Sequence, residues 1–119
     1  MAFRCFLKAK IHRATITFSD LNYEGSLSIC PKLMKAADIL PNERVEVYNV
    51  TNGSRFATYA IEGKEGEIGL NGAAARQGAV GDKIIIVTYT WLDDKEIADH
   101  TSKVILVDDQ NRIVKVLEK

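Results

Sequence analysis

The stretch RVEVYNVTNGSRFATYAIE, residues 44–62, decides the fold class. Both halves are rich in β-branched and aromatic residues, and the pair Asn52-Gly53 lies between them. Such side chains favour extended strands, and an Asn-Gly pair tolerates the positive φ angles that a tight type I′ turn requires. The sequence therefore predicts that residues 44–51 and 54–62 pair as an antiparallel β-hairpin.

Outward from this hairpin, short apolar segments alternate with turn formers, and four more of them have strand character. The segments are IHRATITF (11–18), KIIIVTY (83–89), KVILV (103–107) and RIVKVL (112–117). The segment CPKLMKAADIL (30–40) predicts a short helix with Pro31 in its first turn, and Ala73 to Arg76 could form one helical turn. Six short strands favour a closed barrel, because closure removes exposed sheet edges.

The predicted fold is therefore mainly β, a small closed six-stranded barrel with short helical connectors, and residues 1–119 are expected to form one domain. Lys plus Arg and Asp plus Glu each number 16, so the chain has no charge excess that would attract a nucleic acid or an anionic membrane. No apolar run reaches the roughly 18 residues of a membrane span, and we expect a cytoplasmic protein. Cys5 and Cys30 lack metal-ligand spacing, so we expect buried thiols and no metal.

Two pairs of side chains are candidates for a pocket. Lys10 and His12 alternate with apolar residues at the end of one predicted strand and are expected to look inward, with a bulge near Lys10 where the apolar pattern changes phase. The alternative is a core histidine and a surface lysine. Arg55 and Tyr59 share a face of the second strand of the predicted hairpin, where an arginine can hold a carboxylate and a tyrosine can transfer a proton. The alternative is a solvated arginine and a cross-strand tyrosine.

Four motifs resemble one family when they are taken together. They are KIHRATIT (10–17), LNYEGS (21–26), VTNGSRFATYAI (50–61) and LNGAAAR (70–76), followed by GDKIII (81–86). In their order and spacing the sequence resembles the pyruvoyl-dependent aspartate 1-decarboxylases, which make β-alanine for pantothenate synthesis. The resemblance covers residues 3 to about 90. It implies a double-psi β-barrel, a homotetramer and active sites shared between adjacent subunits.

The resemblance also implies that the chain cuts itself between Gly25 and Ser26. Ser26 would attack the preceding carbonyl, and the resulting ester would eliminate to leave fragments 1–25 and 26–119, the second capped by a pyruvoyl group. A hydroxyl one residue after the scissile carbonyl is placed for this intramolecular attack. The pyruvoyl carbonyl would form a Schiff base with L-aspartate and accept the electrons that remain when carbon dioxide departs.

Roles for the other site residues follow from the same resemblance. Arg55 would hold the carboxylate that stays, Tyr59 would protonate the carbanion or enolate, and Thr58 would assist the ester step, although strand alternation puts Thr58 on the face opposite Arg55 and Tyr59. Lys10 would bind a carboxylate. The remaining pocket residues are Asn71, Gly72, Ala73 and Ala74 as a cradle, His12 and Tyr23 as flanks, and Tyr48 as an aromatic wall. Residues 91–119 match loosely, so we interpret Asp108, Asp109 and His100 as solvated and without function.

Two other functions remain open at this point. A small barrel could be a binding module without enzymatic activity, for example a DNA-binding protein, and a freed Ser26 could be the nucleophile of an amidase-like hydrolase. An uncut chain would favour the binding module, whereas trapping of a carbonyl would separate a pyruvoyl group from a free serine amine. The sequence leaves open whether maturation needs a helper protein, and Arg55 would also hold the carboxylate of glutamate.

Overall fold

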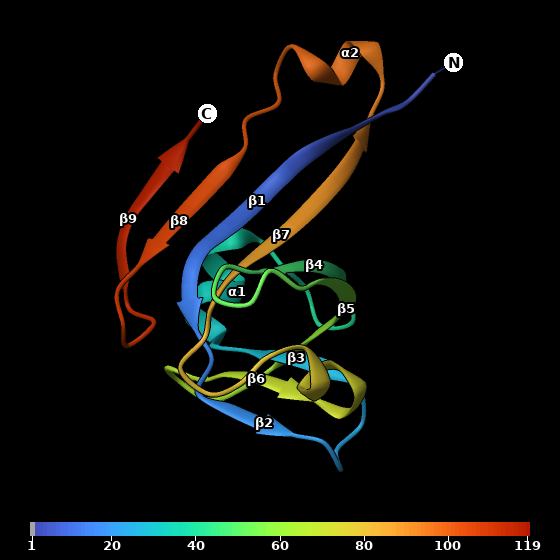
Figure 1. The fold of residues 1–119 in the computed structure, drawn as a ribbon. Helices are drawn as coiled ribbons and strands as arrows, with labels where there is room; N and C mark the ends of the chain where they lie inside the picture. Colours follow the sequence, from blue (N-terminus) through green and yellow to red (C-terminus); the bar gives the residue numbers. More distant parts are fainter. Residues whose placement is uncertain (1) are drawn as a thin grey trace.

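The computed structural model describes residues 2–119, in which nine β-strands are joined by short helices (Figure 1). The elements are β1 (Arg4–Thr15), β2 (Phe18–Asp20), β3 (Ser26–Ile29), α1 (Pro31–Ala37), β4 (Arg44–Asn49), β5 (Arg55–Glu62), β6 (Ile68–Asn71), the 3-10 helix η1 (Gly72–Gln77), β7 (Lys83–Leu92), α2 (Asp94–Ile97), β8 (Lys103–Val107) and β9 (Ile113–Glu118). The prediction of a mainly β protein with short helical connectors is confirmed.

The nine strands pair in the order β2-β6-β3-β5-β4-β7-β1-β8-β9. Most neighbours are antiparallel, and the pairs β1 with β8, β2 with β6 and β3 with β5 are parallel. Figure 1 shows β1, β7, β8 and β9 as a long ribbon that leads away from β2, β3 and β6, with both termini toward its far end. Among the described residues no pair joins β2 to β9, so a closed six-stranded barrel is not confirmed.

Three of the nine strands, β2, β3 and β6, were not predicted. All four residues of β3 and all four of β6 are buried. Alternation of polar and apolar residues marks a strand with one exposed face, and a short strand that is covered on both faces loses that signal. As a consequence, Ser26 begins an interior strand and Asn71 ends another, where the sequence indicated loops.

The β4–β5 hairpin is confirmed, with Val45 opposite Thr58 and Tyr48 opposite Arg55. Its turn is not type I′, because Gly53 has a positive φ of 81° and Asn52 does not. The side chain of Asn49 shapes the turn instead: its Oδ1 accepts the backbone N–H groups of Thr51 and Asn52 at 2.9 and 3.0 Å. A buried asparagine therefore sets a longer loop than the Asn-Gly pair predicts.

The bulge predicted near Lys10 is present, but the inward direction of Lys10 and His12 is wrong. The register between β1 and β7 shifts twice, between Leu7 and Ala9 and between Ile11 and Ala14. Arg13 has a φ of 65° and takes up the extra residue. Ala9, Ile11 and Ala14 are buried, whereas Lys10 and His12 are half-buried on the other face of the strand.

The core lies between α1 and the inner faces of the central strands. Pro31 occupies the first turn of α1, and Leu33, Met34 and Ala37 face the core as the helical spacing predicts. Cys30 is buried, but Cys5 is exposed, because it lies in the ribbon opposite Trp91 rather than against the core. The prediction of a buried thiol is therefore confirmed for Cys30 and wrong for Cys5.

Asp109 is exposed, as the sequence predicted, whereas Asp108 and His100 are half-buried, and each of the three has a partner. Asp109 pairs with Lys83 at 2.6 Å, Asp108 pairs with Arg112 at 2.9 Å, and His100 bonds the carbonyl of Leu7 at 2.8 Å. Within residues 2–119 no helix is both long and apolar enough to cross a membrane. The same residues contain no group of three His, Cys, Asp or Glu side chains that could hold a metal ion.

Candidate active site

Ser26 lies at the start of β3 with 1% of its surface exposed. The antiparallel register sets it opposite Asn71, whose Nδ2 donates a hydrogen bond to the Ser26 Oγ at 3.0 Å. The hydroxyl itself is directed toward the carbonyl oxygen of Glu24 at 3.4 Å. The Ser26 oxygen is therefore held by a side-chain amide and turned toward the main chain that precedes it.

Asn71 holds a second hydroxyl in the same way. Its Nδ2 also donates to the Oγ of Ser28 at 2.9 Å, so both hydrogens of the amide group are used. Ser28 thus engages the second hydrogen of the amide that bonds Ser26. Sequence reasoning missed Ser28, although its place two residues after Ser26 on one strand puts the two hydroxyls on the same face.

Gly72 brings the backbone of η1 against the chain that precedes Ser26. Gly72 has a φ of 64°, and a Cβ atom there would lie 2.7 Å from the Cα and N of Gly25 and 2.8 Å from the carbonyl of Tyr23. Any other residue would displace this backbone. At Gly25, in contrast, an added Cβ would be 4.0 Å from the nearest atom, the carbonyl oxygen of Asn71, so space alone does not require glycine at that position.

A pocket of about 360 Å³ opens beside Gly25. It is lined by Gly25, Phe56, Ala57, Thr58, Tyr59, Ala73, Ala74 and Gln77. Because β3 and β5 are parallel, with Leu27 opposite Ala60, the residues before Leu27 come alongside Thr58 and Tyr59. The pocket thus gathers five of the predicted site residues, and both Thr58 and Tyr59 reach it even though they alternate along β5.

Arg55 does not line this pocket and stacks on an aromatic ring instead. Its guanidinium carbon lies 3.9 Å from the centre of the Tyr48 ring, a cation–π contact. The hydroxyls of Tyr48 and Tyr89 are 2.8 Å apart, and this hydrogen bond, together with burial, raises the pKa of Tyr89 to about 12. Sequence reasoning missed Tyr89, and stacking leaves the polar edge of Arg55 free for an anion.

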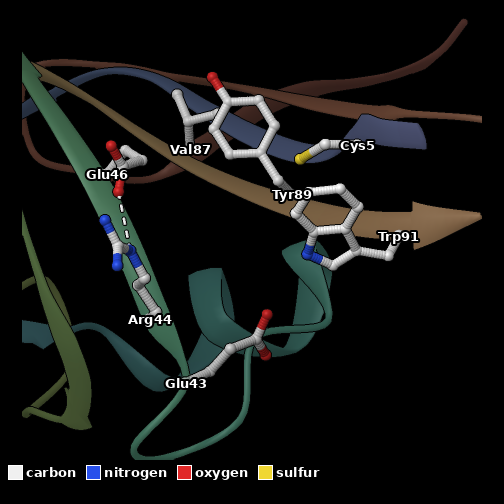
Figure 2. A pocket seen from close by; sticks show the side chains of 7 residues that line it. All are labelled: Cys5, Glu43, Arg44, Glu46, Val87, Tyr89 and Trp91. Carbon is white, nitrogen blue, oxygen red and sulfur yellow. Dashed lines mark hydrogen bonds and ion pairs between the residues drawn. The ribbon is translucent and has the colours of Figure 1, made fainter. Parts of the chain in front are cut away.

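A second hollow, of about 450 Å³, lies on the same outward face (Figure 2). Figure 2 shows Tyr89 and Trp91 projecting from β7 beside Cys5, with an ion pair between Arg44 and Glu46 along β4 on the other side of the hollow. The side chain of Trp91 is 67% exposed and that of Tyr89 is 43% exposed. We call the outward surface of β5, β4, β7 and β1, which carries Arg55, Tyr48, Tyr89, Trp91 and Lys10, the outer face.

The structure does not bring Lys10 and His12 to Ser26. Lys10 pairs with Val87, Val87 with Glu46 and Glu46 with Ala57, so Lys10 lies three strands from β5, or roughly 14 Å at the usual strand spacing. The Nδ1 atom of His12 is buried without a hydrogen-bond partner in the described chain. Burial, and then the charges of Lys10 and Arg13, hold the pKa of His12 below its usual value.

Tyr23 also stands apart from the Gly25 pocket. Its side chain is 54% exposed, and it borders a separate hollow together with Asn71 and Ser28. Asn71 therefore borders the hollow beside Tyr23, whereas Ala73 and Ala74, which follow it in the chain, line the Gly25 pocket.

Comparisons with known proteins identify the family of the chain. The family described as aspartate decarboxylase matches residues 2–114. A protein of Syntrophobacter fumaroxidans named aspartate 1-decarboxylase is 60% identical over 111 residues, which are 92% of this chain and 90% of that protein. Proteins of the same name from Bdellovibrio bacteriovorus and Desulfotalea psychrophila are 55% and 54% identical, covering 90% and 94% of this chain and 86% and 96% of their own lengths. The chain belongs to the aspartate decarboxylase family of carboxy-lyases.

Proposed function

We propose that this chain cuts itself between Gly25 and Ser26 and then converts L-aspartate to β-alanine and carbon dioxide. One observation carries the proposal. The buried Ser26 hydroxyl is held by Asn71 at 3.0 Å and turned toward the preceding main chain, and Gly25 opens directly onto the pocket that contains Thr58 and Tyr59. A reactive hydroxyl, its target carbonyl and a proton-transfer group are thus adjacent.

In the self-cleavage step, the Ser26 oxygen attacks the carbonyl carbon of Gly25 and the peptide C–N bond breaks, which leaves an ester and a free amine at residue 26. Elimination of the ester releases residues 1–25 and leaves dehydroalanine at the start of residues 26–119. Water then replaces the nitrogen and yields a ketone and ammonia. Asn71 orients the oxygen for attack, Thr58 assists the ester step, and orientation of this kind supplies a large part of such a barrier.

The surroundings of residue 26 fit a pyruvoyl group. It would begin β3 beside Asn71, with the Gly25 pocket, which Ala73 and Ala74 help to line, in front of it and the backbone of Gly72 packed against Gly25. When present, this group supplies a carbonyl that acts as an electron sink for decarboxylation. The chain itself supplies binding, orientation and a proton.

Arg55 and Tyr59 divide these tasks. The polar edge of Arg55, left free by its stacking on Tyr48, holds the substrate carboxylate that is retained. Tyr59 lines the pocket next to Gly25 and is 36% exposed, so it can deliver a proton to the carbon from which carbon dioxide has left. Asn71 donates toward the substrate or the pyruvoyl end from the other side.

We further propose that the complete site needs a second copy of the chain. Lys10 and Arg55 belong to one site by role but lie on strands roughly 14 Å apart within one chain. The outer face carries both residues together with exposed Trp91 and Tyr89, side chains that are enriched in protein interfaces. A homotetramer would bring Lys10, and with it His12 and Tyr23, to the Arg55 of a neighbour, on which the Tyr48 of that same neighbour already stacks. The double-psi topology, a single domain over residues 1–119 and a cytoplasmic location without nucleic-acid partners belong to the same proposal.

The proposal is tested by intact mass spectrometry of the purified and aged full-length protein, with and without hydroxylamine. We expect two fragments that end at Gly25 and begin at residue 26, and the larger one should gain mass when its carbonyl reacts. A single uncut chain that still releases carbon dioxide from aspartate would contradict the proposal. A cut chain with a free serine amine and no carbonyl would indicate an amidase-like hydrolase instead. Addition of a cell extract to an uncut preparation would reveal a helper, and parallel assays with glutamate would define selectivity.

A further inference from the structure

Asn111 is a buried asparagine in the turn between β8 and β9, far from the site in the sequence. Its side chain is 3% exposed, and its φ of 61° is in the left-handed region. Asparagine accepts this conformation more readily than most residues. Burial of its side-chain amide costs free energy unless the amide is fully hydrogen-bonded.

The Asn111 amide is fully hydrogen-bonded, and all its partners are backbone groups. Its Oδ1 accepts the N–H of Thr15 at 2.7 Å, and its Nδ2 donates to the carbonyls of Thr15 and Gly66, each at 2.9 Å. Toward Thr15 the side chain behaves like a residue of a neighbouring strand. It therefore ties together two segments that lie 51 residues apart in the sequence (66 − 15).

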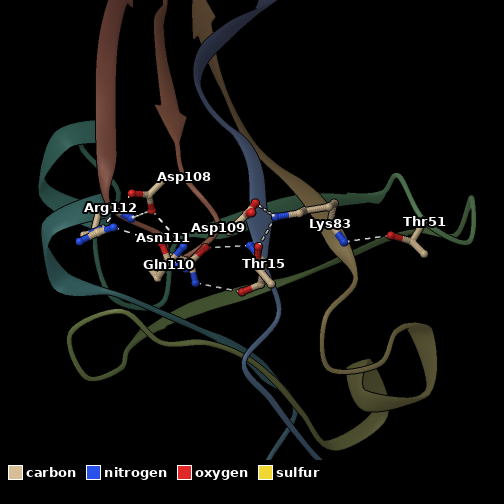
Figure 3. Close-up of polar contacts among 8 residues, drawn as sticks. All are labelled: Thr15, Thr51, Lys83, Asp108, Asp109, Gln110, Asn111 and Arg112. Carbon is tan, nitrogen blue, oxygen red and sulfur yellow. Dashed lines mark hydrogen bonds and ion pairs between the residues drawn. The ribbon is translucent and has the colours of Figure 1, made fainter.

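The turn that presents Asn111 is itself braced (Figure 3). One carboxylate oxygen of Asp108 accepts the N–H groups of Gln110 and Arg112, each at 2.9 Å. Lys83 bridges the Oγ1 of Thr15 and the carboxylate of Asp109, each at 2.6 Å. Figure 3 shows the side chains of Asn111 and Lys83 converging on Thr15, so Thr15 is held by both.

Thr15 and Gly66 lead into two strands that reach Asn71 together. Thr15 precedes β2 and Gly66 precedes β6, and these strands run parallel, with Asp20 opposite Asn71. Between them, the hydroxyl of Thr17 both donates to the carbonyl of Ile68 and accepts its N–H, at 3.1 and 3.0 Å. Asn111 thus fixes the beginning of both strands, and Asn71 at their end holds Ser26.

We propose that Asn111 is a positioning residue that sets Asn71 against Ser26 from roughly 16 Å away, the length of the five-residue path from Gly66 to Asn71. The inference rests on the proposed function, because it assigns Asn111 to the alignment of the self-cleaving pair. Its action is indirect: it fixes two strand beginnings, and the strands carry the alignment to the site.

The test compares Asn111→Gly with Gln110→Ala in the full-length chain. Glycine keeps the positive φ and removes only the side chain, whereas Gln110→Ala removes an exposed side chain from the same turn, with its bond to Arg112 at 3.1 Å. Amide hydrogen exchange is measured on both in an uncut Ser26→Ala background. The initial rate of cleavage is measured by intact mass on both in the unaltered background, per folded molecule.

We expect Asn111→Gly to raise exchange in residues 16–20 and 66–71 but not in the hairpin of residues 44–62. We also expect it to slow cleavage on the order of 10- to 100-fold, as small misalignments distant from the chemistry do. Gln110→Ala should change neither. Unchanged exchange in the two segments, an equal rise everywhere, or cleavage at the unaltered rate would each overturn the proposal.

Two further arms keep the test decisive. If Asn111→Gly does not fold, Asn111→Asp replaces it, because the carboxylate keeps the bond from the N–H of Thr15 and loses both donations, and the same outcomes apply. If the unaltered chain stays uncut even after addition of a cell extract, the proposed function fails, and the exchange measurement alone decides on Asn111. If residues 66–71 of Asn111→Gly keep their protection from hydrogen exchange, the positioning role is overturned. If these residues lose protection while the hairpin keeps it, the role is supported.

Discussion

Asn71 and Asn111 hold the two ends of the same path, and they use their amides in different ways. Both are almost completely buried, at 2% and 3% exposure. Asn111 bonds the backbone of two distant segments, whereas Asn71 bonds two side-chain hydroxyls, one of which belongs to Ser26. The hydrogen bonds of Asn111 to backbone groups stabilise the fold. The hydrogen bonds of Asn71 to hydroxyls orient a reactive group.

The difference follows from what each partner can do. The N–H and C=O groups of Thr15 and Gly66 are fixed by the backbone, so bonds to them immobilise segments. The hydroxyls of Ser26 and Ser28 can rotate and can exchange hydrogen-bond roles, so the bonds from Asn71 orient them without removing their reactivity. Substitutions around Ser26 should therefore change the rates of cleavage and turnover. Substitutions where backbone segments are held together should change the free energy of unfolding.

Substitution of the two hydroxyls held by Asn71 should have the largest effect. We expect Ser26→Ala to give an uncut chain without decarboxylase activity, because no nucleophile and no precursor of the ketone remain. Ser28→Ala is the matched control, since it removes the other hydroxyl on the same amide and should still be cut. Intact mass and carbon dioxide release check both variants. A split and active Ser26→Ala protein would abolish the distinction between the two serines.

Tyr59→Phe should separate maturation from turnover. The variant keeps the ring in the Gly25 pocket and loses the proton, so it should cut itself normally and lose about 10²- to 10⁴-fold in turnover, the usual contribution of a positioned acid. Tyr89→Phe, which removes a hydroxyl from the outer face, is the control and should lose less than about tenfold. Decarboxylation at the full rate by Tyr59→Phe would remove Tyr59 from the role of proton donor.

A pair of glycines tests the contribution of backbone packing beside the site. Gly72→Ala and Gly53→Ala both place a Cβ at positive φ, at a cost of about 1 to 2 kcal/mol. At Gly72 the Cβ also meets the backbone of Gly25 at 2.7 Å, whereas nothing lies within 4 Å at Gly53. We expect Gly72→Ala to lose about 1 to 3 kcal/mol more of the free energy of unfolding. Urea denaturation in the uncut Ser26→Ala background measures this difference, and equal losses would contradict the close contact.

The smallest effect is expected from His12, which lies outside both regions. Its pKa is below 6.5 in the folded chain, first because of burial, so the unfolded chain binds the proton more readily. Its contribution to stability is therefore present above pH 6.5 and is lost as the pH falls from 6.5 through the lowered folded value. Denaturation midpoints between pH 7.5 and pH 5 should fall less for His12→Gln than for the unaltered chain. A parallel decline of the two proteins would indicate that His12 does not titrate on unfolding.

The sequence by itself determined the features that depend on neighbours along the chain. The β-branched and aromatic residues of 44–62, with Asn52-Gly53 between them, predicted the β4–β5 hairpin, and Pro31 with the spacing of Leu33, Met34 and Ala37 predicted α1. The motifs around Ser26 and Arg55 indicated the family before any fold was known. These signals are local, because side-chain direction repeats with a fixed period in each kind of secondary structure.

Tertiary structure alone decided where the site residues lie and what holds them. Alternation cannot reveal β3 and β6, because both of their faces are buried, and it gave Lys10 and His12 the wrong direction because Arg13 takes up an extra residue. The partners of Asn71 lie 45 and 43 residues away, and Thr15 lies 96 residues from Asn111. A buried amide is stabilised by whichever groups the folded chain brings to it, and no local pattern in the sequence records that choice.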